Sequence, residues 1–449
     1  MTDLLVHPAT RPLVGSVSAP SDASIGHLAL VLAACGDGQT RISGFSRAGD
    51  TLVTMQCLRD LGIAIEEPSR GEILVKGAGL YGWRAPDDPL DCAASSATLR
   101  LLVGPLAGQR FSSVLVGGSP DSPLALMDLA TALRARGARI DGLPDPTRKD
   151  DTTVPLTVGR MHEARPLTGI EYASGISSTQ LKAAVLMSGL AADGVTHYSE
   201  PTVSADHTER LLAALGAPLR TAGPVIELDP TRWDGRIPAF DLSLPGDISA
   251  AGYVLAASQL VAGSRVTIRR VGINPTRSGL LEIVRDMDGG LGVEPQGDSS
   301  GEPVADLHGW PKPLRAIPVG GETIARAVEE MPIVCALAAR AHGTTRLRAV
   351  GGLRDEAVDR LAKLASALRL FGVACDARDD GIDVVGSDLP LQAAEVDGFG
   401  DPALAMTFVV LALVANGPTR VRRAQSIARV YPKFVATLRA LGARVDVQN

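Results

Sequence analysis

Aromatic residues are scarce in this chain: they make up 3% of its 449 residues, whereas hydrophobic residues of all kinds make up 45%. A core with so few aromatic rings has to be filled by smaller side chains, so we expect Ala, Leu and Val to form it. The length and the hydrophobic content predict a globular protein with two or more domains.

The cysteine pattern lacks the signs of disulfides and of metal sites. The five cysteines occur singly, without CxxC spacing and without clustered histidines. We therefore expect buried thiols in a reducing compartment. These cysteines are Cys35, Cys57, Cys92, Cys335 and Cys375.

Basic clusters and long apolar runs are also missing. The basic residues are dispersed and the formal net charge is -6, which disfavours nucleic acids and anionic membranes as partners. The longest apolar run, near residues 405–415, is too short to span a bilayer. The first residues do not show the basic-then-apolar pattern of a secretory signal. We expect a cytoplasmic protein.

What the chain does contain is one unit that occurs six times. Each copy has an apolar helix rich in small residues, a strand that starts near a glycine, and a more polar helix that in most copies ends just before a glycine. This order predicts strand, helix, strand, helix, strand, with the apolar helices inside and the polar ones outside. The apolar helices are expected to begin near Ser24, Ser95, Ser177, Ser249, Glu330 and Asp401.

The repeats also indicate where the chain divides. Roughly 70 to 85 residues per copy suits a compact α/β subdomain, and three copies per domain is the simplest packing. Two similar turns, SAPSDAS from Ser18 and LPGDISA from Leu244, occur about half the chain apart. We expect one lobe to contain residues 21–244, and the other to contain 1–20 and 245–449. Residues 296–314, rich in Gly, Pro and Asp, are predicted to form a surface insertion.

In order and over essentially the whole length, these motifs resemble those of the 5-enolpyruvylshikimate-3-phosphate (EPSP) synthase family. The matching segments include APSDAS, SSTQLKAAVLMSGL, DHTERLLAALG, LPGDISAAGYVLA and NPTRSGL. The resemblance implies an α/β fold of two lobes, an inside-out α/β barrel with three βαβαββ units per lobe. It also implies a monomer whose cleft between the lobes binds small-molecule substrates, without a metal or another cofactor.

In that family, phosphoenolpyruvate is protonated, the 5-hydroxyl of 3-phosphoshikimate adds to it, and phosphate leaves. The resemblance is weakest at the positions that neutralise these anions. Each lost charge-assisted hydrogen bond weakens binding by about 1.5–3 kcal/mol. The family's basic positions are occupied here by Ala23, Leu28, Pro123 or Ala125, Ala205, Glu356, Pro402 and Ala403.

Other positions of the family's site keep polar residues. Two carboxylates form the predicted catalytic pair: Glu329 stands at the family's catalytic Asp, and Glu356 replaces a Lys. The predicted substrate-binding residues are Ser24, Arg100, Ser178, Gln180, Ser204, Arg360 and Arg429. These residues also have a structural interpretation, in which the serines are helix caps and the arginines are salt-bridge partners.

Three functions are compatible with this pattern. The first hypothesis is a repurposed enzyme in which Glu329 and Glu356 perform acid/base chemistry, such as dehydration, on a less anionic, shikimate-like cyclic hydroxy acid. The second is a non-catalytic homologue that serves as a ligand sensor or partner subunit. The third is the orthodox synthase, in which Arg429, Lys433 or Lys182 would replace the missing charges.

Overall fold

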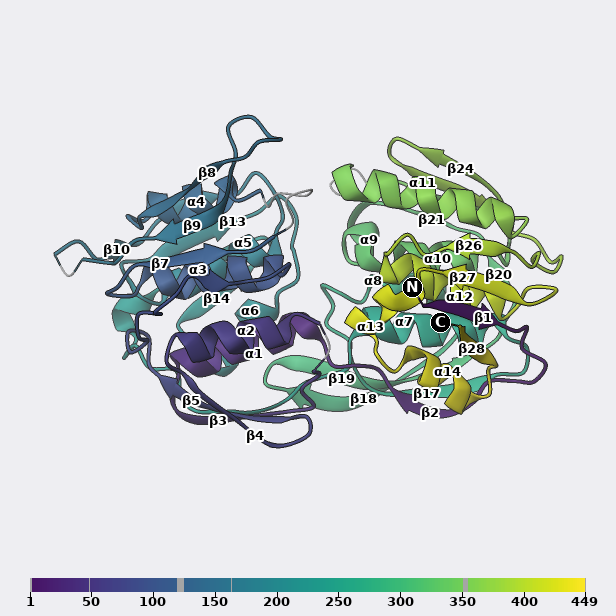
Figure 1. Cartoon of the computed structure of the whole chain (residues 1–449), viewed down its shortest axis with the longest axis horizontal. Helices are drawn as coiled ribbons and strands as arrows, with labels where there is room; N and C mark the ends of the chain where they lie inside the picture. Colours follow the sequence, from purple (N-terminus) through teal and green to yellow (C-terminus); the bar gives the residue numbers. More distant parts are fainter. Residues whose placement is uncertain (1, 48, 119–124, 163, 350–353, 449) are drawn as a thin grey trace. The chain divides into compact units, whose positions relative to one another are not determined.

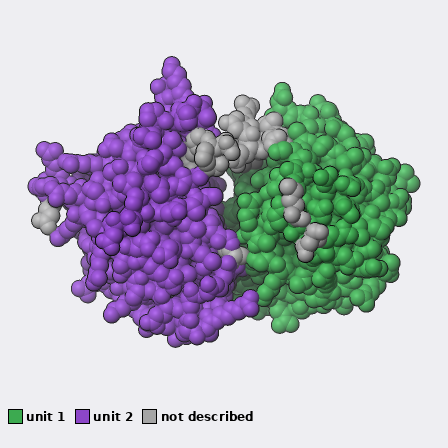
Figure 2. Space-filling view, viewed as in Figure 1, with its two compact units in different colours: residues 1–20, 245–298, 303–449 green, residues 21–244, 299–302 purple. Residues whose placement is uncertain are grey.

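The structure, a computed structural model, describes residues 1–449 apart from 1, 48, 119–124, 163, 350–353 and 449 (Figure 1). Of residues 354–359 it describes the backbone alone. The chain forms two compact units, coloured separately in Figure 2. One contains residues 21–244 and 299–302, and the other contains residues 1–20, 245–298 and 303–449.

The unit built around residues 21–244 alternates short strands with helices. Its helices are α1 (Ala23–Cys35), α2 (Thr51–Asp60), α3 (Ser96–Ala107), α4 (Met127–Ala135), α5 (Thr179–Gly189), α6 (His207–Ala214) and the 3-10 helix η1 (Pro230–Arg232). Its strands are β3 (Asp37–Ser43), β4 (Ala64–Ser69), β5 (Glu72–Ala78), β6 (Leu90–Asp91), β7 (Ser113–Val116), β8 (Ile140–Pro144), β9 (Thr152–Val158), β10 (Leu167–Thr168), β11 (Glu171–Ala173), β12 (Ala192–Asp193), β13 (Thr196–Ser199), β14 (Leu219–Ala222), β15 (Val225–Leu228) and β16 (Asp241–Ser243).

The other unit repeats this alternation and contains both ends of the chain. Its helices are α7 (Ile248–Leu260), α8 (Gly279–Asp286), α9 (Gly321–Ala325), η2 (Val328–Glu330), α10 (Met331–Ala338), α11 (Arg354–Leu370), α12 (Pro402–Ala412), η4 (Ala424–Ser426), α13 (Ile427–Val430) and α14 (Phe434–Leu441). Its strands are β1 (Asp3–Val6), β2 (Val14–Ser18), β17 (Arg265–Gly272), β18 (Gly290–Ser299), β19 (Glu302–Trp310), β20 (Leu314–Arg315), β21 (Pro318–Val319), β22 (Ala341–His342), β23 (Thr344–Leu347), β24 (Ala374–Arg378), β25 (Gly381–Val385), β26 (Glu395–Asp397), β27 (Thr419–Arg422) and β28 (Val445–Gln448).

One sheet design recurs through the described part of both units. In the sheet β16-β3-β5-β4, the first pair is parallel and the next two pairs are antiparallel. The sheets β6-β7-β9-β8, β11-β13-β15-β14 and β26-β27-β1-β28 have the same pattern. The N-terminal strand β1 thus lies between β27 and β28, beside the end of the chain. The predicted two-lobe α/β fold built from repeated units is confirmed.

The expected surface insertion at residues 296–314 is wrong. This segment contains the end of β18 and the whole of β19, two neighbouring strands of the sheet β18-β19-β17-β2. On β19, Ala305, Leu307 and Gly309 are buried, whereas Asp306 and His308 between them are half-buried. This alternation with a period of two is the signal of a strand with one buried face, which the turn-forming composition obscured.

The apolar helices are buried on every side, as predicted. In α1, every residue from Ile25 to Cys35 is buried, and in α5 every residue from Leu181 to Gly189 is buried. Helices α7, α10 and α12 of the other unit are buried in the same way. Such helices need small residues where two of them cross, because the backbones approach closely.

The crossing of α3 and α5 gives a stability prediction. A Cβ atom on Gly104 would lie 2.6 Å from the carbonyl oxygen of Ala184, whereas a Cβ on Gly26 of α1 would have its nearest contact at 3.5 Å. We expect Gly104→Ala to lower the free energy of unfolding by about 1–3 kcal/mol through overpacking. The matched control Gly26→Ala should raise it by up to about 1 kcal/mol through helix propensity. Urea unfolding measures both, and equal effects of the two changes would contradict this packing.

Candidate functional site

The predicted site residues lie mostly near the N-termini of the buried helices. In the unit built around 21–244, Ser24 is in the first turn of α1, Arg100 is in α3, and Ser178 and Gln180 are at the start of α5. Caps satisfy the first backbone N–H groups of these helices: the side chains of Asp22, Ser95 and Ser178 accept from Ile25, Thr98 and Leu181. The structural interpretation of Ser178 as a cap is therefore correct.

A closed ring of five side chains joins the starts of α1, α2 and α3. His27 Nδ1 lies 2.6 Å from Thr54 Oγ1, which lies 2.8 Å from Thr98 Oγ1. Thr98 donates to Ser95 Oγ at 2.8 Å, and Ser95 donates to Asp50 at 2.5 Å. Asp50 Oδ1 lies 3.1 Å from His27 Nε2, which closes the ring. The ring fixes the first turns of the three helices, and with them the positions of Ser24 and Arg100.

Asp50 is the charged member of this ring. Burial on its own would raise the pKa of Asp50, but hydrogen bonds and charge from His27, with a hydrogen bond from Ser95, lower the pKa to about 2. The ordinary value is 3.8. A carboxyl whose pKa is lower in the folded state contributes stability above its ordinary pKa, and this contribution is lost as the pH falls through the folded value.

Asp50→Asn should therefore change the acid dependence of stability. The side chain is 41% exposed, so after solvent screening we expect the wild type to lose only about 1 kcal/mol more than the variant between pH 5 and pH 2. Chemical unfolding at several pH values measures this difference. Asp60→Asn, at the exposed end of the same helix, is the control and should follow the wild-type curve. If the free energy of unfolding depended on pH in the same way for the wild type and for Asp50→Asn, the ring would not stabilise the charged form of Asp50.

Lys182 is the centre of a buried ionic cluster. Its side chain is 0% exposed, and Nζ lies 3.0 Å from Glu200 Oε1 and 2.8 Å from Glu209 Oε1. Burial raises the pKa of Glu209, and the charge of Lys182 offsets part of this rise. Lys182 is therefore buried and paired with Glu200 and Glu209, so the expectation that it could replace a missing substrate-binding cation is wrong. A lysine in an apolar helix requires buried carboxylates nearby.

Removing that lysine should destabilise the fold strongly. Lys182→Met leaves two buried carboxylates without their cation, which we expect to cost about 3–5 kcal/mol of unfolding free energy. Adding Glu209→Gln should recover part of the loss, because one of the two charges is removed. Lys433→Met changes an exposed lysine and serves as the control. Thermal and urea unfolding test this, and a single variant as stable as the control would contradict the cluster.

The same cluster holds the loop of Ser204 beside the start of α5. Lys182 Nζ donates to the Ser204 carbonyl at 3.1 Å, and the backbone N–H of Ser204 donates to Glu200 Oε1 at 2.8 Å. The Ser204 hydroxyl also donates to Glu200. Further along the loop, the N–H of Thr202 donates to Ser177 Oγ at 2.9 Å. The structure thus brings Ser178 and Ser204 to the same helix end.

Arg100 is held within its own unit. Its guanidinium donates to Ser96 Oγ at 3.1 Å and to the carbonyl of Ala125. Burial lowers the pKa of Arg100, while the carboxylates of Asp128 and Asp151 offset part of this change. Arg100 is therefore oriented by uncharged partners, which leaves its charge to attract an anion.

In the other unit, three predicted residues gather at the start of α12. Arg360 Nε donates to Asp401 Oδ2 at 2.7 Å, and Arg360 Nη1 lies 3.9 Å from Glu329 Oε2. Asp401 is also the N-cap of α12. Arg429 donates to the carbonyl of Gly400, next to this cap, at 2.8 Å. Burial lowers the pKa of Arg360, but the charge of Asp401 and its hydrogen bond outweigh this, so that the pKa is raised.

The predicted pairing of Glu329 with Glu356 cannot be followed, since Glu356 belongs to α11 but its side chain lies outside the described residues. Glu329 is 56% exposed, whereas its neighbour Glu330 is buried, accepts from Ser249 and lies 3.6 Å from Arg277. Burial raises the pKa of Glu330, and Arg277 offsets part of this rise. Among the described residues, no three His, Cys, Asp or Glu side chains are grouped so that they could hold a metal.

The remaining expectations concern thiols and membranes. All five cysteines are free thiols, and burial raises the pKa of Cys35 to about 12. In the described part of the chain, no helix is both long enough and apolar enough to cross a membrane.

Comparisons with known proteins show which class this fold represents. The fold matches solved enolpyruvyl transferases: EPSP synthase from Acinetobacter baumannii has 31% sequence identity and a TM-score of 0.91, with 100% of each chain covered. The enolpyruvyl transferase NikO from Streptomyces tendae has 20% identity and a TM-score of 0.76, a likeness of fold alone.

The sequence comparisons are more specific. Residues 8–438 match the family model for EPSP synthase (3-phosphoshikimate 1-carboxyvinyltransferase). A 3-phosphoshikimate 1-carboxyvinyltransferase of Geobacter sp. (strain M21) is 37% identical over 438 residues, covering 98% of this chain and 99% of the relative. One from Acidithiobacillus ferrooxidans is 38% identical over 449 residues, with both chains fully covered. The chain belongs to the EPSP synthase family, whose members are transferases.

These findings correct the first functional hypothesis. Full-length relatives at 37–38% identity are named as carboxyvinyltransferases, so the expectation of a lyase that dehydrates a cyclic hydroxy acid through Glu329 and Glu356 is wrong. The comparisons support the orthodox alternative instead. The error came from giving seven substituted basic positions more weight than the similarity of the whole chain.

Several residues that organise the site were missed from the sequence. Asp50 stands directly before α2, and no role was predicted for it. Glu200 and Glu209 could have been sought as partners, because Lys182 interrupts an otherwise apolar helical segment. Asp401 was predicted only as a position near which an apolar helix begins, although an acidic residue before an apolar helix is a typical N-cap.

Proposed function

We propose that this protein is a 3-phosphoshikimate 1-carboxyvinyltransferase. It would transfer the carboxyvinyl group of phosphoenolpyruvate to the 5-hydroxyl of 3-phosphoshikimate and release inorganic phosphate, acting as a monomer in the cytoplasm. The observation that carries the proposal is the similarity over the full length to carboxyvinyltransferases at 37–38% identity. The residues proposed to contact substrates are Ser24, Arg100, Ser178, Gln180, Ser204, Arg360 and Arg429.

The start of α5 suits the 3-phosphate of 3-phosphoshikimate. Ser178 uses its oxygen to accept from Leu181, so its hydroxyl hydrogen can be donated to a phosphate oxygen. The N-terminal N–H groups and the helix dipole attract an anion to the same place, and Gln180 is two residues into the first turn. The Ser204 loop, held by Lys182 and Glu200, can then contribute its backbone and hydroxyl.

The start of α12 suits phosphoenolpyruvate. Arg360 and Arg429 are both fixed there, one by Asp401 and the other by the Gly400 carbonyl. The distance of 3.9 Å between Arg360 and Glu329 is too long for a hydrogen bond. An incoming phosphate or carboxylate could therefore take that side of the guanidinium without breaking the pair with Asp401.

The proton transfers need one base and one acid. The exposed carboxylate of Glu329 is suited to accept the proton that the 5-hydroxyl loses when its oxygen attacks. We place Glu356 as the acid that protonates the methylene carbon, on the basis of its position four residues before Arg360 in α11. Protonation of the methylene carbon and attack by the 5-hydroxyl oxygen give a tetrahedral adduct with a methyl group. Glu356, now a carboxylate, then takes a proton back from that methyl carbon as phosphate leaves with the electrons of its C–O bond, which restores the vinyl double bond, and the proton held by Glu329 passes to the phosphate.

The test is release of inorganic phosphate from phosphoenolpyruvate, measured with and without 3-phosphoshikimate. We expect release that depends on 3-phosphoshikimate, and a loss of roughly 10- to 100-fold in kcat/KM for Arg360→Ala, the effect of one charge-assisted hydrogen bond. Arg422→Ala, which removes an exposed arginine paired with Glu395 in the same unit, is the matched control and should leave kcat/KM unchanged.

Phosphate release that does not require 3-phosphoshikimate, or none from the wild type, would overturn the proposed activity. Equal losses in Arg360→Ala and Arg422→Ala would leave the activity in place but exclude α12 as the binding site of phosphoenolpyruvate.

A further inference from the structure

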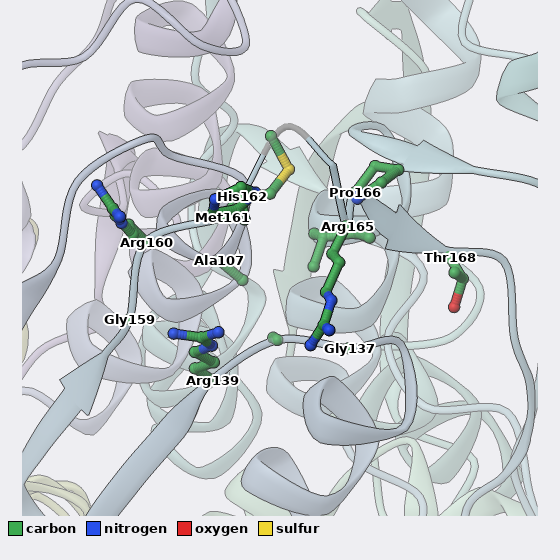
Figure 3. A pocket seen from close by; sticks show the side chains of 12 residues that line it. Ala107, Gly137, Arg139, Gly159, Arg160, Met161, His162, Arg165, Pro166 and Thr168 are labelled. Carbon is green, nitrogen blue, oxygen red and sulfur yellow. The ribbon is translucent and has the colours of Figure 1, made fainter.

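A cavity of about 420 Å³ lies in the unit built around residues 21–244 (Figure 3), and its described lining includes no residue proposed to contact the substrates. It forms where the segment after α4, the segment between β9 and β10, and the end of α3 meet. Its volume falls in the range of small-molecule pockets. None of the twelve described residues that line it belongs to the helix starts of the candidate site.

The lining is strongly basic. Arg139, Arg160 and Arg165 line the cavity together with His162, and none of the described lining residues is acidic. Within the described part of the chain, the structure gives these three guanidinium groups no carboxylate partner. Three arginines without a carboxylate partner among the described residues, around one cavity, contrast with the net charge of -6 of the whole chain. Charge of this kind at a concave surface attracts anions.

Part of the cavity lining is apolar: Ala107, Ala138 and Leu167 are buried, and Met161 and Pro166 also line the cavity. We call these five residues the floor of the cavity. An inorganic ion would leave such a surface in contact with water. The combination of an apolar floor and a cationic rim suits a ligand that has an anionic group attached to an apolar body.

The backbone around the cavity is fixed by hydrogen bonds that the packing of the unit provides. The N–H of Met161 donates to the Gln109 carbonyl at 2.8 Å, and the N–H of Arg160 donates to Ser112 Oγ at 3.1 Å. A Cβ on Gly159 would lie 2.8 Å from Cβ of Arg139, so the stem of Arg139 rests on that glycine. These contacts hold the backbone of Arg160 and the base of the Arg139 side chain in place before any ligand arrives, so binding has to order only the outer parts of the side chains.

We propose that this cavity binds a small phosphate ester whose phosphate group lies against Arg139, Arg160 and Arg165 and whose apolar body lies on the floor. Guanidinium groups suit this ligand class, because their planar donors match phosphate oxygens in pairs. The ligand is distinct from the two substrates of the proposed reaction, and the site is separate from the helix starts that hold them.

The test uses calorimetric titration with phenyl phosphate as the probe and inorganic phosphate as the comparison. We expect saturable binding of phenyl phosphate at a concentration on the order of 1 mM or less, and weaker binding of inorganic phosphate, which cannot use the floor. Arg139→Ala and Arg165→Ala should each weaken the binding of phenyl phosphate about tenfold or more. Thermal unfolding of each variant should confirm that these exposed changes leave the fold intact.

Two control variants separate this site from others. Arg220→Ala removes an arginine that is 87% exposed on β14 of the same unit, and Arg100→Ala removes a cation of the candidate active site; neither should affect the binding of phenyl phosphate to the cavity. The proposal fails if the wild type shows no saturable binding, if Arg220→Ala weakens binding as much as Arg165→Ala, or if Arg100→Ala alone abolishes it. Equal affinity for both probes would exclude a role for the apolar floor.

Discussion

The structure depends on burying helices that are apolar on every side. Such a helix has no polar face to expose to water, so it must be surrounded by other helices and by sheets. Its first backbone N–H groups, which have no partner within the helix, must be capped. Asp22, Ser95, Ser178, Asp247 and Asp401 provide these caps for five of the buried helices. The helix starts are therefore the places where partial positive charge and polar side chains meet the interior, and the candidate substrate contacts lie there.

Most of the fold could be predicted because the repeated pattern gives the same information several times. A run such as SSTQLKAAVLMSGL indicates a buried helix, and its recurrence excludes a surface helix at each copy. Composition misled the prediction at residues 296–314, since turn-forming residues lie within two real strands, at exposed positions of β18 and at half-buried or buried positions of β19. The close approach of α3 to α5 at Gly104 could not be predicted, because one glycine among 48 does not reveal its partner.

The site was predicted less well than the fold, for an electrostatic reason. Comparing positions one by one shows which cations are absent, but not what else supplies positive charge. The start of α5 is a source of that kind. Arg360 and Arg429 were predicted from the sequence, but the bonds to Asp401 and to the Gly400 carbonyl that place both beside α12 were not. Lys182 shows the opposite case: the sequence offers it as a cation for the substrates, but in the structure it forms buried ion pairs with Glu200 and Glu209.

The central claim is that the capped starts of buried helices hold the substrates. The most direct test is an experimental structure of the protein with 3-phosphoshikimate bound. The account predicts that the 3-phosphate lies at the start of α5, within hydrogen-bond distance of Ser178 and of the loop that carries Ser204. A phosphate held away from this helix start, for example by Arg139 and Arg165, would contradict it.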